Sequence, residues 1–550
     1  MLIDLRRIRW VFSSWELHTL SRNTSGDTEI TRAASVVGAG TLLSRILGLI
    51  RDVILTSLFP AGTSLDAFVV AFRIPNLFRR LFGEGALNAA FIPVFSEYLT
   101  KRSRREAFDL ARTVLTALLL ILTAITALAI VFAPEFLRIQ VPGWAEAAQS
   151  GGTEKTELTA WLLRVMFPYV VLVCLTALCA AMLNTMRHFA SGAFYPVLLN
   201  VSIIGSALLL TGHFKEPVRA LAVGVIVGGV LQLLLQAPPL IRRGFSFRPM
   251  LKLRHPGFRR ILMLMLPAML GFGVVEINAY VDMLLASFLA PGSNSYLFFA
   301  NRLVQLPLAL FGIAVATPIL PKLSKLFAQG NTGEFQRTFG LGMRLIVFFT
   351  LPSTAGLIIL RRPIVNLLFE RGAFTSETTD AVAFTLLFYA MGVFAFAAVK
   401  TIAAVFYAQK DTKTPVVVAT VALVSNVVLN LILMQFLAYG GLALASSISS
   451  FINFGLLMFL ARRRTTLSLA TGDIAAMLKS LVAAAGMTFG CVALYALVGY
   501  DFSASFGHRL LQLAAIIAGS VGILASCSKL LGCEELKLLV SSFTRKREGR

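Results

Sequence analysis

Five arginines lie within segments that are otherwise apolar enough to cross a membrane. They are Arg45, Arg51, Arg73, Arg79 and Arg302. An arginine at the centre of a bilayer costs about 3 kcal/mol or more, so it is kept where it lines a polar cavity or has a partner. The planar guanidinium also binds phosphate through paired hydrogen bonds. These arginines therefore predict a pathway for an anionic, phosphorylated substrate.

The first of these segments places Arg45 and Asp52 seven residues apart, on one face of a helix, whereas Arg51 points about 120° away. Asp52 then neutralises only part of the positive charge. We assign Arg45, Arg51 and Asp52 to a substrate site. One alternative stays open, because Arg51 and Asp52 would also suit a charged pair that reaches out to the membrane interface.

The second segment carries a polar stripe, since Asp66, Arg73 and Arg80 follow one another at intervals of seven residues. Such a stripe suits the wall of a cavity. Arg79 falls on a different face, and we include it and Asn76 with Asp66 and Arg73 among the substrate-binding residues. A purely structural network of ion pairs is the alternative interpretation.

The eighth segment contains Arg302 between Asn301 and Gln305. Because no acidic residue is near it in the sequence, a structural ion pair is harder to argue for Arg302 than for the other arginines. We therefore assign Arg302 to substrate binding.

A second set of polar residues lies in other apolar segments and offers oxygen ligands. Asp282, Asn426, Asn430 and Ser446 could surround a monovalent cation that drives transport. Hydrogen bonding between helices is the commoner reason for such residues, and this alternative stays open.

The elements that position these residues are predicted to be transmembrane helices. Of the 550 residues, 57% are hydrophobic and only 14% are charged, whereas about a quarter of a soluble protein is charged. Pro75 and Gly83 interrupt the second of some fourteen apolar helical stretches. The stretches are residues 34–58, 65–99, 107–133, 158–185, 190–211, 217–240, 257–290, 295–321, 337–360, 379–408, 413–436, 440–461, 474–498 and 508–531. The expected fold class is an all-α polytopic membrane protein.

The net charge of +23 does not indicate nucleic-acid binding, because the basic residues form short clusters between the apolar stretches. These clusters follow the even-numbered stretches, which predicts that both termini are cytoplasmic. Arg361, Arg362 and Arg371, on an outer loop, are the exception. The chain contains no HExxH, Walker or GxSxG motif, so we expect a transporter and not an enzyme.

A weak internal repeat predicts the domain organisation. Residues 92–96 resemble residues 320–324, and Arg73 corresponds to Arg302, with separations of roughly 225 residues. We expect two lobes of six helices and two additional helices at the end, with the substrate site between the lobes. The predicted parts are an N-terminal extension (1–32), an N-lobe (33–240), a C-lobe (241–465), and a final helix pair with a basic cytoplasmic tail (466–550).

The chain resembles the MurJ/MviN family of lipid II flippases, in the multidrug/oligosaccharidyl-lipid/polysaccharide exporter superfamily. Four segments carry the resemblance: SRILGLIRD (44–52), DAFVVAFRIPNLFRRLFGEGALNAAFIPVFSEY (66–98), FFANRLVQLPLALFGIAVATPILPKLSK (298–325) and FYAQKDTKTP (406–415). The resemblance implies a multi-pass protein of the bacterial inner membrane. It would move undecaprenyl-diphosphate-linked disaccharide-pentapeptide to the outer leaflet for peptidoglycan synthesis.

The resemblance also implies roles for single residues. Arg45, Arg51, Arg79 and Arg302 match arginines that line the central cavity of the family, and Asp66 matches a functional acid. Spans thirteen and fourteen would hold the polyprenyl tail. Two departures are Asn301 and Gln305, which stand where some members have acids.

The expected partners are lipid II, membrane lipids and other cell-wall synthesis proteins, without nucleic acid. No cofactor is expected, and the membrane potential or a monovalent cation would drive transport. Because Asn430 is neutral where a carboxylate occurs in the family, cation coupling has the weaker basis of the two. An exporter of another polyprenyl-linked glycan is the alternative function. A glycosyltransferase would need catalytic carboxylates, for which Asp66 and Glu84 are a thin basis, and a multidrug cation exporter would need an acidic cavity.

Overall fold

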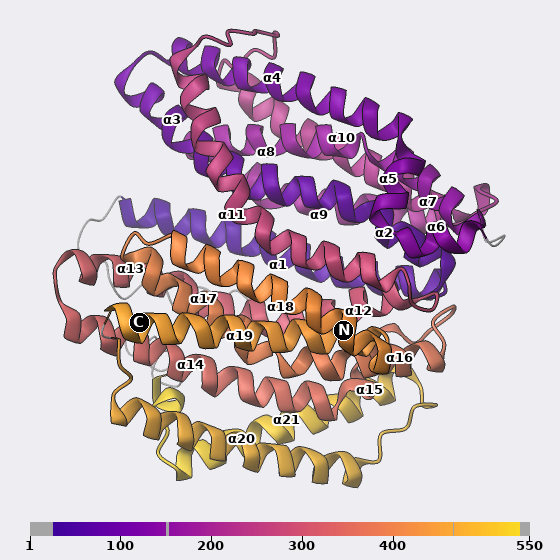
Figure 1. The fold of residues 1–550 in the computed structure, drawn as a ribbon, viewed down its shortest axis with the longest axis vertical. Helices are drawn as coiled ribbons and strands as arrows, with labels where there is room; N and C mark the ends of the chain where they lie inside the picture. The colour runs from indigo at the N-terminus through magenta and orange to yellow at the C-terminus, as the bar shows by residue number, and fades with distance from the viewer. Residues whose placement is uncertain (1–25, 150–152, 466, 539–550) are drawn as a thin grey trace. The chain divides into compact units, whose positions relative to one another are not determined.

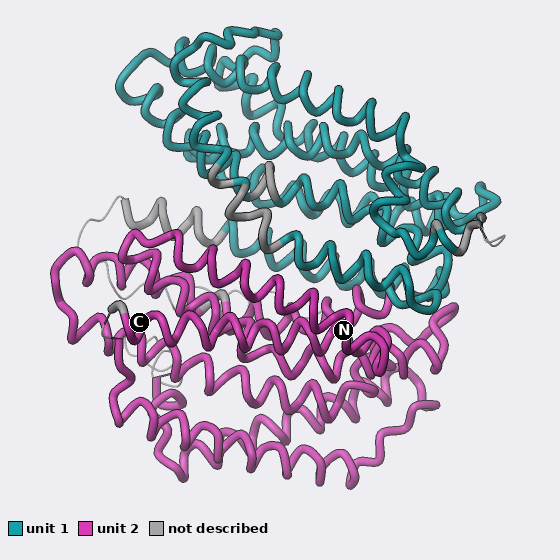
Figure 2. Tube along the Cα trace, in the orientation of Figure 1, with its two compact units in different colours: residues 1–294 teal, residues 295–550 magenta. Residues whose placement is uncertain are grey.

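The computed structural model describes residues 26–149, 153–465 and 467–538, and these residues contain helices but no strand. The all-α fold class is therefore confirmed. The chain divides into two compact units, residues 1–294 and 295–550 (Figure 2). The predicted N-terminal extension lies mostly outside the described residues, as does the basic tail after residue 538.

Unit 1 contains the helices of the first seven predicted spans (Figure 1). They are α1 (Gly26–Leu58), α2 (Thr63–Phe78), η2 (Arg79–Ala86), α3 (Leu87–Lys101), α4 (Arg104–Val131), α5 (Ala133–Gln140), α6 (Pro142–Gln149), α7 (Thr153–Met166), α8 (Tyr169–Thr185), α9 (Ala190–Leu209), η3 (Thr211–His213), α10 (Arg219–Arg242) and α11 (Pro256–Ala286).

Unit 2 contains the helices of the last seven predicted spans. They are α12 (Ser293–Pro307), η4 (Leu308–Ile313), α13 (Ala314–Ala328), α14 (Thr332–Ile359), α15 (Arg361–Phe369), α16 (Ser376–Met391), α17 (Val393–Ala408), α18 (Lys413–Leu437), α19 (Tyr439–Thr465), α20 (Thr471–Val498) and α21 (Phe506–Leu530). The last two helices share a buried apolar cluster with α15, which includes Leu367, Cys491 and Ile516.

Eleven helical stretches within the described residues are long and apolar enough to cross a membrane. They coincide with predicted spans three to six and eight to fourteen. The other three predicted spans are helical as well, namely α1, the run from α2 through η2 to α3, and α11. The helix count is therefore compatible with fourteen spans.

Polar side chains mark the beginnings of several of these helices. The Ser103 hydroxyl accepts a hydrogen bond from the Glu106 backbone N–H at the start of α4, at 3.2 Å. Asn331 caps α14 in the same way through Glu334 N–H, at 3.1 Å. Such caps satisfy backbone donors that have no partner in the first turn of a helix, so they fix where the helix begins.

The interruption expected in the second span takes the form of a π-helix, and the chain stays helical through it. The π-helical segment η2 follows Pro75, and the π-helical segment η4 follows Pro307 in the eighth span. A π-helix widens the backbone turn and often marks a functional site. The two segments occupy corresponding places in the predicted repeat, because Arg73 and Arg302 precede them at nearly equal distances.

Helix packing within each unit shows the same correspondence. In unit 1, α10 packs against α8 and α9, and in unit 2, α19 packs against α17 and α18. The compact units divide at residue 294, whereas the predicted lobes divide at residue 240. The difference arises because α11, the seventh span, packs against η2 and α3. The lobe boundary itself stays a prediction.

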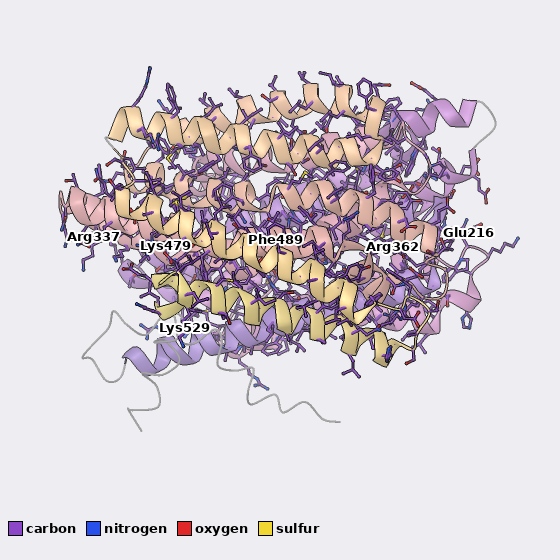
Figure 3. All side chains as sticks on the ribbon, turned by 90° about the horizontal axis from the view of Figure 1, so that it is seen from below. Glu216, Arg337, Arg362, Lys479, Phe489 and Lys529 are labelled. Atoms are coloured by element: carbon purple, nitrogen blue, oxygen red, sulfur yellow. The ribbon has the colours of Figure 1, made fainter. Side chains whose placement is uncertain are left out.

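The outer surface of unit 2 has the distribution of side chains expected of a membrane protein. Phe489, midway along α20, is 78% exposed. Arg337, Lys479 and Lys529 lie toward one end of the unit and Arg362 toward the other (Figure 3). An apolar surface between charged ends suits helices surrounded by lipid.

Candidate functional site

The predicted polar stripe of the second span faces α11. Arg73 donates a hydrogen bond from Nη2 to the backbone carbonyl of Ala279, at 2.6 Å. About two turns further, Arg80 Nη1 lies 2.9 Å from Glu276 Oε1 in an ion pair. Both arginines therefore contact the seventh span within the same unit. The structural alternative for the stripe gains support at Arg80, whose partner is Glu276.

The first residue of the stripe, Asp66, is buried and holds three segments together. Its Oδ2 accepts a hydrogen bond from Lys155 Nζ at 2.8 Å and from the Gly292 backbone N–H at 2.7 Å. Lys155 also lies over the ring of Trp144, at 3.9 Å from the centroid. Asp66 thus joins the start of α2 to α7 and to the turn after α11, and Lys155 in turn contacts α6.

Arg51 and Asp52 form a buried pair on α1. Arg51 Nη2 and Nε donate to Asp52 Oδ1 at 2.6 and 3.0 Å, and the side chain of Asp52 is fully buried. The side chain of Arg51 is long enough to contact Asp52, although the side chains of adjacent residues leave a helix in directions about 100° apart. Burial disfavours the alternative of a pair that reaches the membrane interface.

A second element completes this pair. Arg51 Nη1 donates to Asn200 Oδ1 on α9, at 3.1 Å, and Asn200 Nδ2 donates to the carbonyl of Ser44, at 3.1 Å. Asn200 therefore holds the guanidinium and the backbone of α1 at once. This arrangement fixes the position of Arg51 but also uses several of its donors.

The remaining predicted residues of unit 1 are Arg45, Asn76 and Arg79. Arg45 lies on an exposed face of α1. Arg79 Nε donates to Asn76 Oδ1, at 3.0 Å, so these two residues form a pair within one turn. The bonds of the predicted arginines thus run to different elements: Arg51 to α9, Arg73 to α11, and Arg79 to α2.

In unit 2, Arg302 is partly exposed on α12. The two residues that depart from the family pattern contact each other beside it, where Gln305 Nε2 donates to Asn301 Oδ1, at 3.3 Å. Two neutral amides therefore stand where carboxylates could lower the positive charge around Arg302.

Three of the four predicted cation ligands lie together in unit 2. Asn430 Nδ2 donates to Asn426 Oδ1 at 2.9 Å, and Asn426 Nδ2 donates to Ser446 Oγ at 3.4 Å. These bonds occupy oxygens that a cation would need, as the hydrogen-bonding alternative predicts. Asp282 is buried on α11 in unit 1. Within the searched part of the chain, no cluster of three His, Cys, Asp or Glu side chains has a metal-binding arrangement.

Two residues with important contacts were not predicted from the sequence. Asn200 is a single amide within the apolar α9, and its burial in a membrane span could have indicated a charged partner. Lys155 gave no comparable signal, because it begins a span where a basic residue is ordinary. Its contact with Asp66 depends on tertiary structure.

Comparison with known proteins connects these residues to a family. Residues 55–517 match the family described as "Lipid II flippase MurJ". A "Probable lipid II flippase MurJ" of Vibrio cholerae serotype O1 is 40% identical over 78% of this chain and 82% of its own length. A "Lipid II flippase MurJ" of Burkholderia cenocepacia is 36% identical over 79% of this chain and 84% of its own length.

The chain belongs to the MurJ family of lipid II flippases. A solved structure titled "Lipid II flippase MurJ, inward closed conformation" matches with a TM-score of 0.76 and 29% identity, over 90% of this chain and 99% of the other. An inward-facing multidrug resistance MATE transporter of the MOP superfamily has a TM-score of 0.65 at 14% identity, over 79% of this chain and 99% of the other. The second likeness shows the fold alone. The family inferred from the sequence motifs is confirmed.

Proposed function

We propose that this protein is a lipid II flippase of the bacterial inner membrane, with both termini in the cytoplasm. Membership of the MurJ family, shown by the match over residues 55–517, carries the proposal. The substrate is the undecaprenyl-diphosphate-linked disaccharide-pentapeptide, which moves from the inner to the outer leaflet. This is transport without a change of covalent bonds, so the protein is not an enzyme in this proposal.

The arginines supply the chemistry that the diphosphate needs. When the diphosphate leaves water, it loses hydration that guanidinium N–H groups can replace with charge-assisted hydrogen bonds. Arg45 on an exposed helix face and the partly exposed Arg302 are the best placed to meet a ligand. Asp52 and Asn200 hold Arg51, which supports a role for Arg51 in shaping the field around the substrate.

Asp66 has a different role in this proposal. Its contacts with Lys155 and Gly292 tie together the ends of several helices in unit 1. Alternating access requires groups of helices to move as bodies about the substrate path. Asp66 would keep one such body intact, and the π-helical segments in spans two and eight would allow each helix to bend.

The membrane potential is the simplest driving force for this transport. With the cell interior negative, outward movement of one negative charge is favoured by about 2.3 kcal/mol per 100 mV. Coupling to a monovalent cation at Asp282, Asn426, Asn430 and Ser446 is a further proposal. Cation binding would require the side-chain hydrogen bonds among Asn426, Asn430 and Ser446 to break.

Complementation tests the proposed function. A bacterium depleted of its own lipid II flippase should grow and keep its shape when this protein is expressed. A strain that lacks an exporter of a different polyprenyl-linked glycan should not be rescued at the same expression level. Rescue of the second strain alone would contradict the proposal and favour the other glycan as substrate.

A further inference from the structure

A second basic cluster lies outside the residues assigned to lipid II, where α4 begins and α10 ends in unit 1. A cavity of about 380 Å³ opens there. Its lining includes Arg104, Arg105, Arg112 and Arg243, together with the ring of Phe108. Four guanidinium groups around one cavity are unusual, because like charges repel unless a counter-charge joins them.

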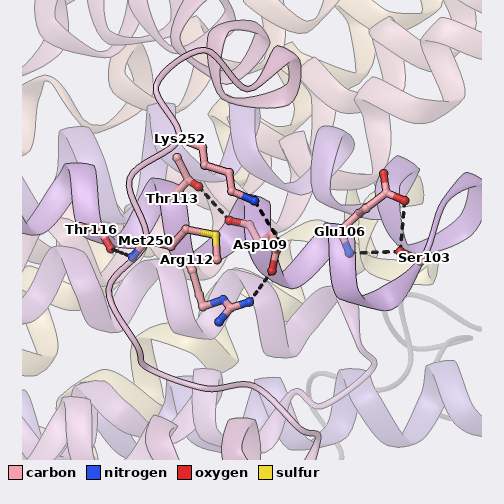
Figure 4. Close-up of polar contacts among 8 residues, drawn as sticks. All are labelled: Ser103, Glu106, Asp109, Arg112, Thr113, Thr116, Met250 and Lys252. Atoms are coloured by element: carbon pink, nitrogen blue, oxygen red, sulfur yellow. Dashed lines mark hydrogen bonds and ion pairs between the residues drawn. The ribbon is translucent and has the colours of Figure 1, made fainter.

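The local fold explains why these side chains converge. Arg104, Arg105, Phe108 and Arg112 occupy the first turns of α4. After α10 the chain turns at Gly244, whose φ of 79° favours glycine. The following segment then runs beside α4, where the Met250 backbone N–H donates to Thr116 Oγ1, at 3.0 Å (Figure 4).

Aromatic packing holds the same segment in place. The rings of Phe108 and Phe245 meet edge to face with centroids 5.5 Å apart. Arg104 Nη2 also donates to the carbonyl of Arg243, at 2.6 Å. The turn after α10 is thus bound to α4 at several points, so the arginines of the two elements are held around one cavity.

The positive charge of this cavity is only partly balanced. Arg112 pairs with Asp109, and Lys252 Nζ lies 3.5 Å from the same carboxylate (Figure 4). Arg243 donates to the carbonyl of Pro239, at 3.2 Å, which is uncharged. Among the described residues, Arg104, Arg105 and Arg243 form no ion pair with a carboxylate. The cavity therefore retains a net positive charge.

Two further observations support an anion site. The Nε of Arg112 is buried and has no hydrogen-bond acceptor within the described chain. Outside the spans, burial and the nearby charge of Arg243 lower the pKa of His188. The charge of Arg243 is thus one of the two causes that disfavour a protonated His188 beside the cavity.

Exposed apolar side chains on α10, the helix that ends at the cavity, favour an anion that also has an apolar part. Val227, Leu234 and Ile241 are exposed at intervals of seven residues along α10, with 58% exposure at Ile241. This apolar stripe ends two residues before Arg243. A ligand with a phosphate in the cavity and acyl chains along α10 would satisfy both surfaces.

We propose that this cavity binds the phosphate of a negatively charged phospholipid from the surrounding leaflet. Arg105 and Arg243 approach the phosphate from α4 and from the end of α10, and the acyl chains lie on the stripe of α10. The site is separate from the arginines assigned to lipid II, so the inference goes beyond the proposed function.

Native mass spectrometry of the full-length protein in an uncharged detergent tests this site. The protein is titrated with phosphatidylglycerol and, separately, with the net-neutral phosphatidylcholine. The Arg105→Gln/Arg243→Gln double variant should bind the first phosphatidylglycerol roughly thirtyfold more weakly. Its binding of phosphatidylcholine should not change. If the double variant does not fold, Arg105→Gln alone should weaken binding roughly fivefold, because Arg105 is exposed.

The matched control is Arg242→Gln/Arg248→Gln, which removes the same charge from exposed arginines that do not line the cavity. This control should keep the affinity of the wild type. Equal weakening in both double variants, or in neither, would overturn the proposal. Inorganic phosphate serves as the competitor without acyl chains. If inorganic phosphate binds to the wild type and the Arg105→Gln/Arg243→Gln substitutions weaken its binding, while phosphatidylglycerol does not bind at all, the site takes a soluble anion. In that case the proposal is wrong.

Discussion

At the scale of residues, the arginines of the predicted spans differ in their exposure and in the partners that they contact. Arg51 and Arg80 have carboxylate partners within unit 1. Arg45 lies exposed, and Arg302 is partly exposed beside two neutral amides. We expect the ion-paired arginines to shape the electrostatic field, and Arg45 and Arg302 to contact the substrate.

The buried pair of Arg51 and Asp52 predicts a large loss of stability when one partner is removed. Asp52→Ala should lower the free energy of unfolding by about 3 kcal/mol, because it leaves a buried guanidinium without its counter-charge. Equilibrium unfolding of the purified protein in detergent measures this change. Glu334→Ala, which breaks an exposed pair with Arg337, should cost less than about 1 kcal/mol. Equal losses in the two variants would contradict this account of the pair.

Arg51→Lys should be partly tolerated. A lysine keeps the positive charge near Asp52, but it cannot contact Asp52 and Asn200 with the geometry of the guanidinium. Growth of a flippase-depleted strain should therefore fall between the results for wild type and Arg51→Ala, at equal protein abundance. If Arg51→Lys is as inactive as Arg51→Ala, the prediction is wrong and the geometry of the guanidinium is essential.

At the scale of elements, ion pairs as well as apolar packing hold the last two spans, α20 and α21, against the other helices of unit 2. Arg344 on α14 lies 2.6 Å from Glu535, 2.7 Å from Glu534 and 3.6 Å from Asp473. Glu535 is fully buried. The hydrogen bond and charge of Arg344 lower the pKa of the exposed Glu534. The contribution of Glu534 is therefore present above the ordinary carboxylate pKa and is lost as the pH falls through the lowered value.

Arg344→Ala should loosen α20 and α21 from the rest of unit 2. Removal of the guanidinium leaves Glu535 buried without its partner, which costs about 3 kcal/mol. Hydrogen exchange in residues 471–530 should become faster, while exchange in α18 should not change. Arg337→Ala, an exposed arginine on the same helix, serves as the control. The double substitution Arg344→Met/Glu535→Leu should recover much of the protection, because it removes the fully buried carboxylate together with its partner.

The sequence predicted the elements better than it predicted their contacts. Each predicted apolar stretch is helical in the structure, and eleven of the helical stretches among the described residues are long and apolar enough to cross a membrane. The seven-residue spacing placed Asp66, Arg73 and Arg80 on one face. The partners Lys155, Asn200 and Glu276 come from elements far away in the chain, so periodicity along one helix could not identify which of them meet. The π-helices could not be predicted from the sequence either. Proline and glycine indicate that a helix is interrupted, but they do not indicate what backbone geometry the interruption has.

At the scale of the whole molecule, the orientation in the membrane rests on the distribution of basic residues. We predict that cysteines introduced at Arg102, Leu251 and Arg462 are protected from an impermeant thiol reagent in intact cells. A cysteine at Lys215, in a loop predicted to be outside, should react. Four native cysteines are buried and Cys527 is partly buried, so their background reaction is low. Labelling at the three inner positions without labelling at Lys215 would reverse the orientation.

The central claim is that Arg302 takes part in moving the diphosphate of lipid II across the membrane. The most direct measurement is the rate at which lipid II in the inner leaflet of reconstituted vesicles becomes accessible from outside. The wild type should move lipid II at a measurable rate. Arg302→Ala and Arg302→Lys should each lose at least tenfold in rate, roughly the effect of one charge-assisted hydrogen bond, while they reconstitute as well as the wild type. A wild type that moves no lipid II, or an Arg302→Ala variant that moves it at the normal rate, would contradict the account.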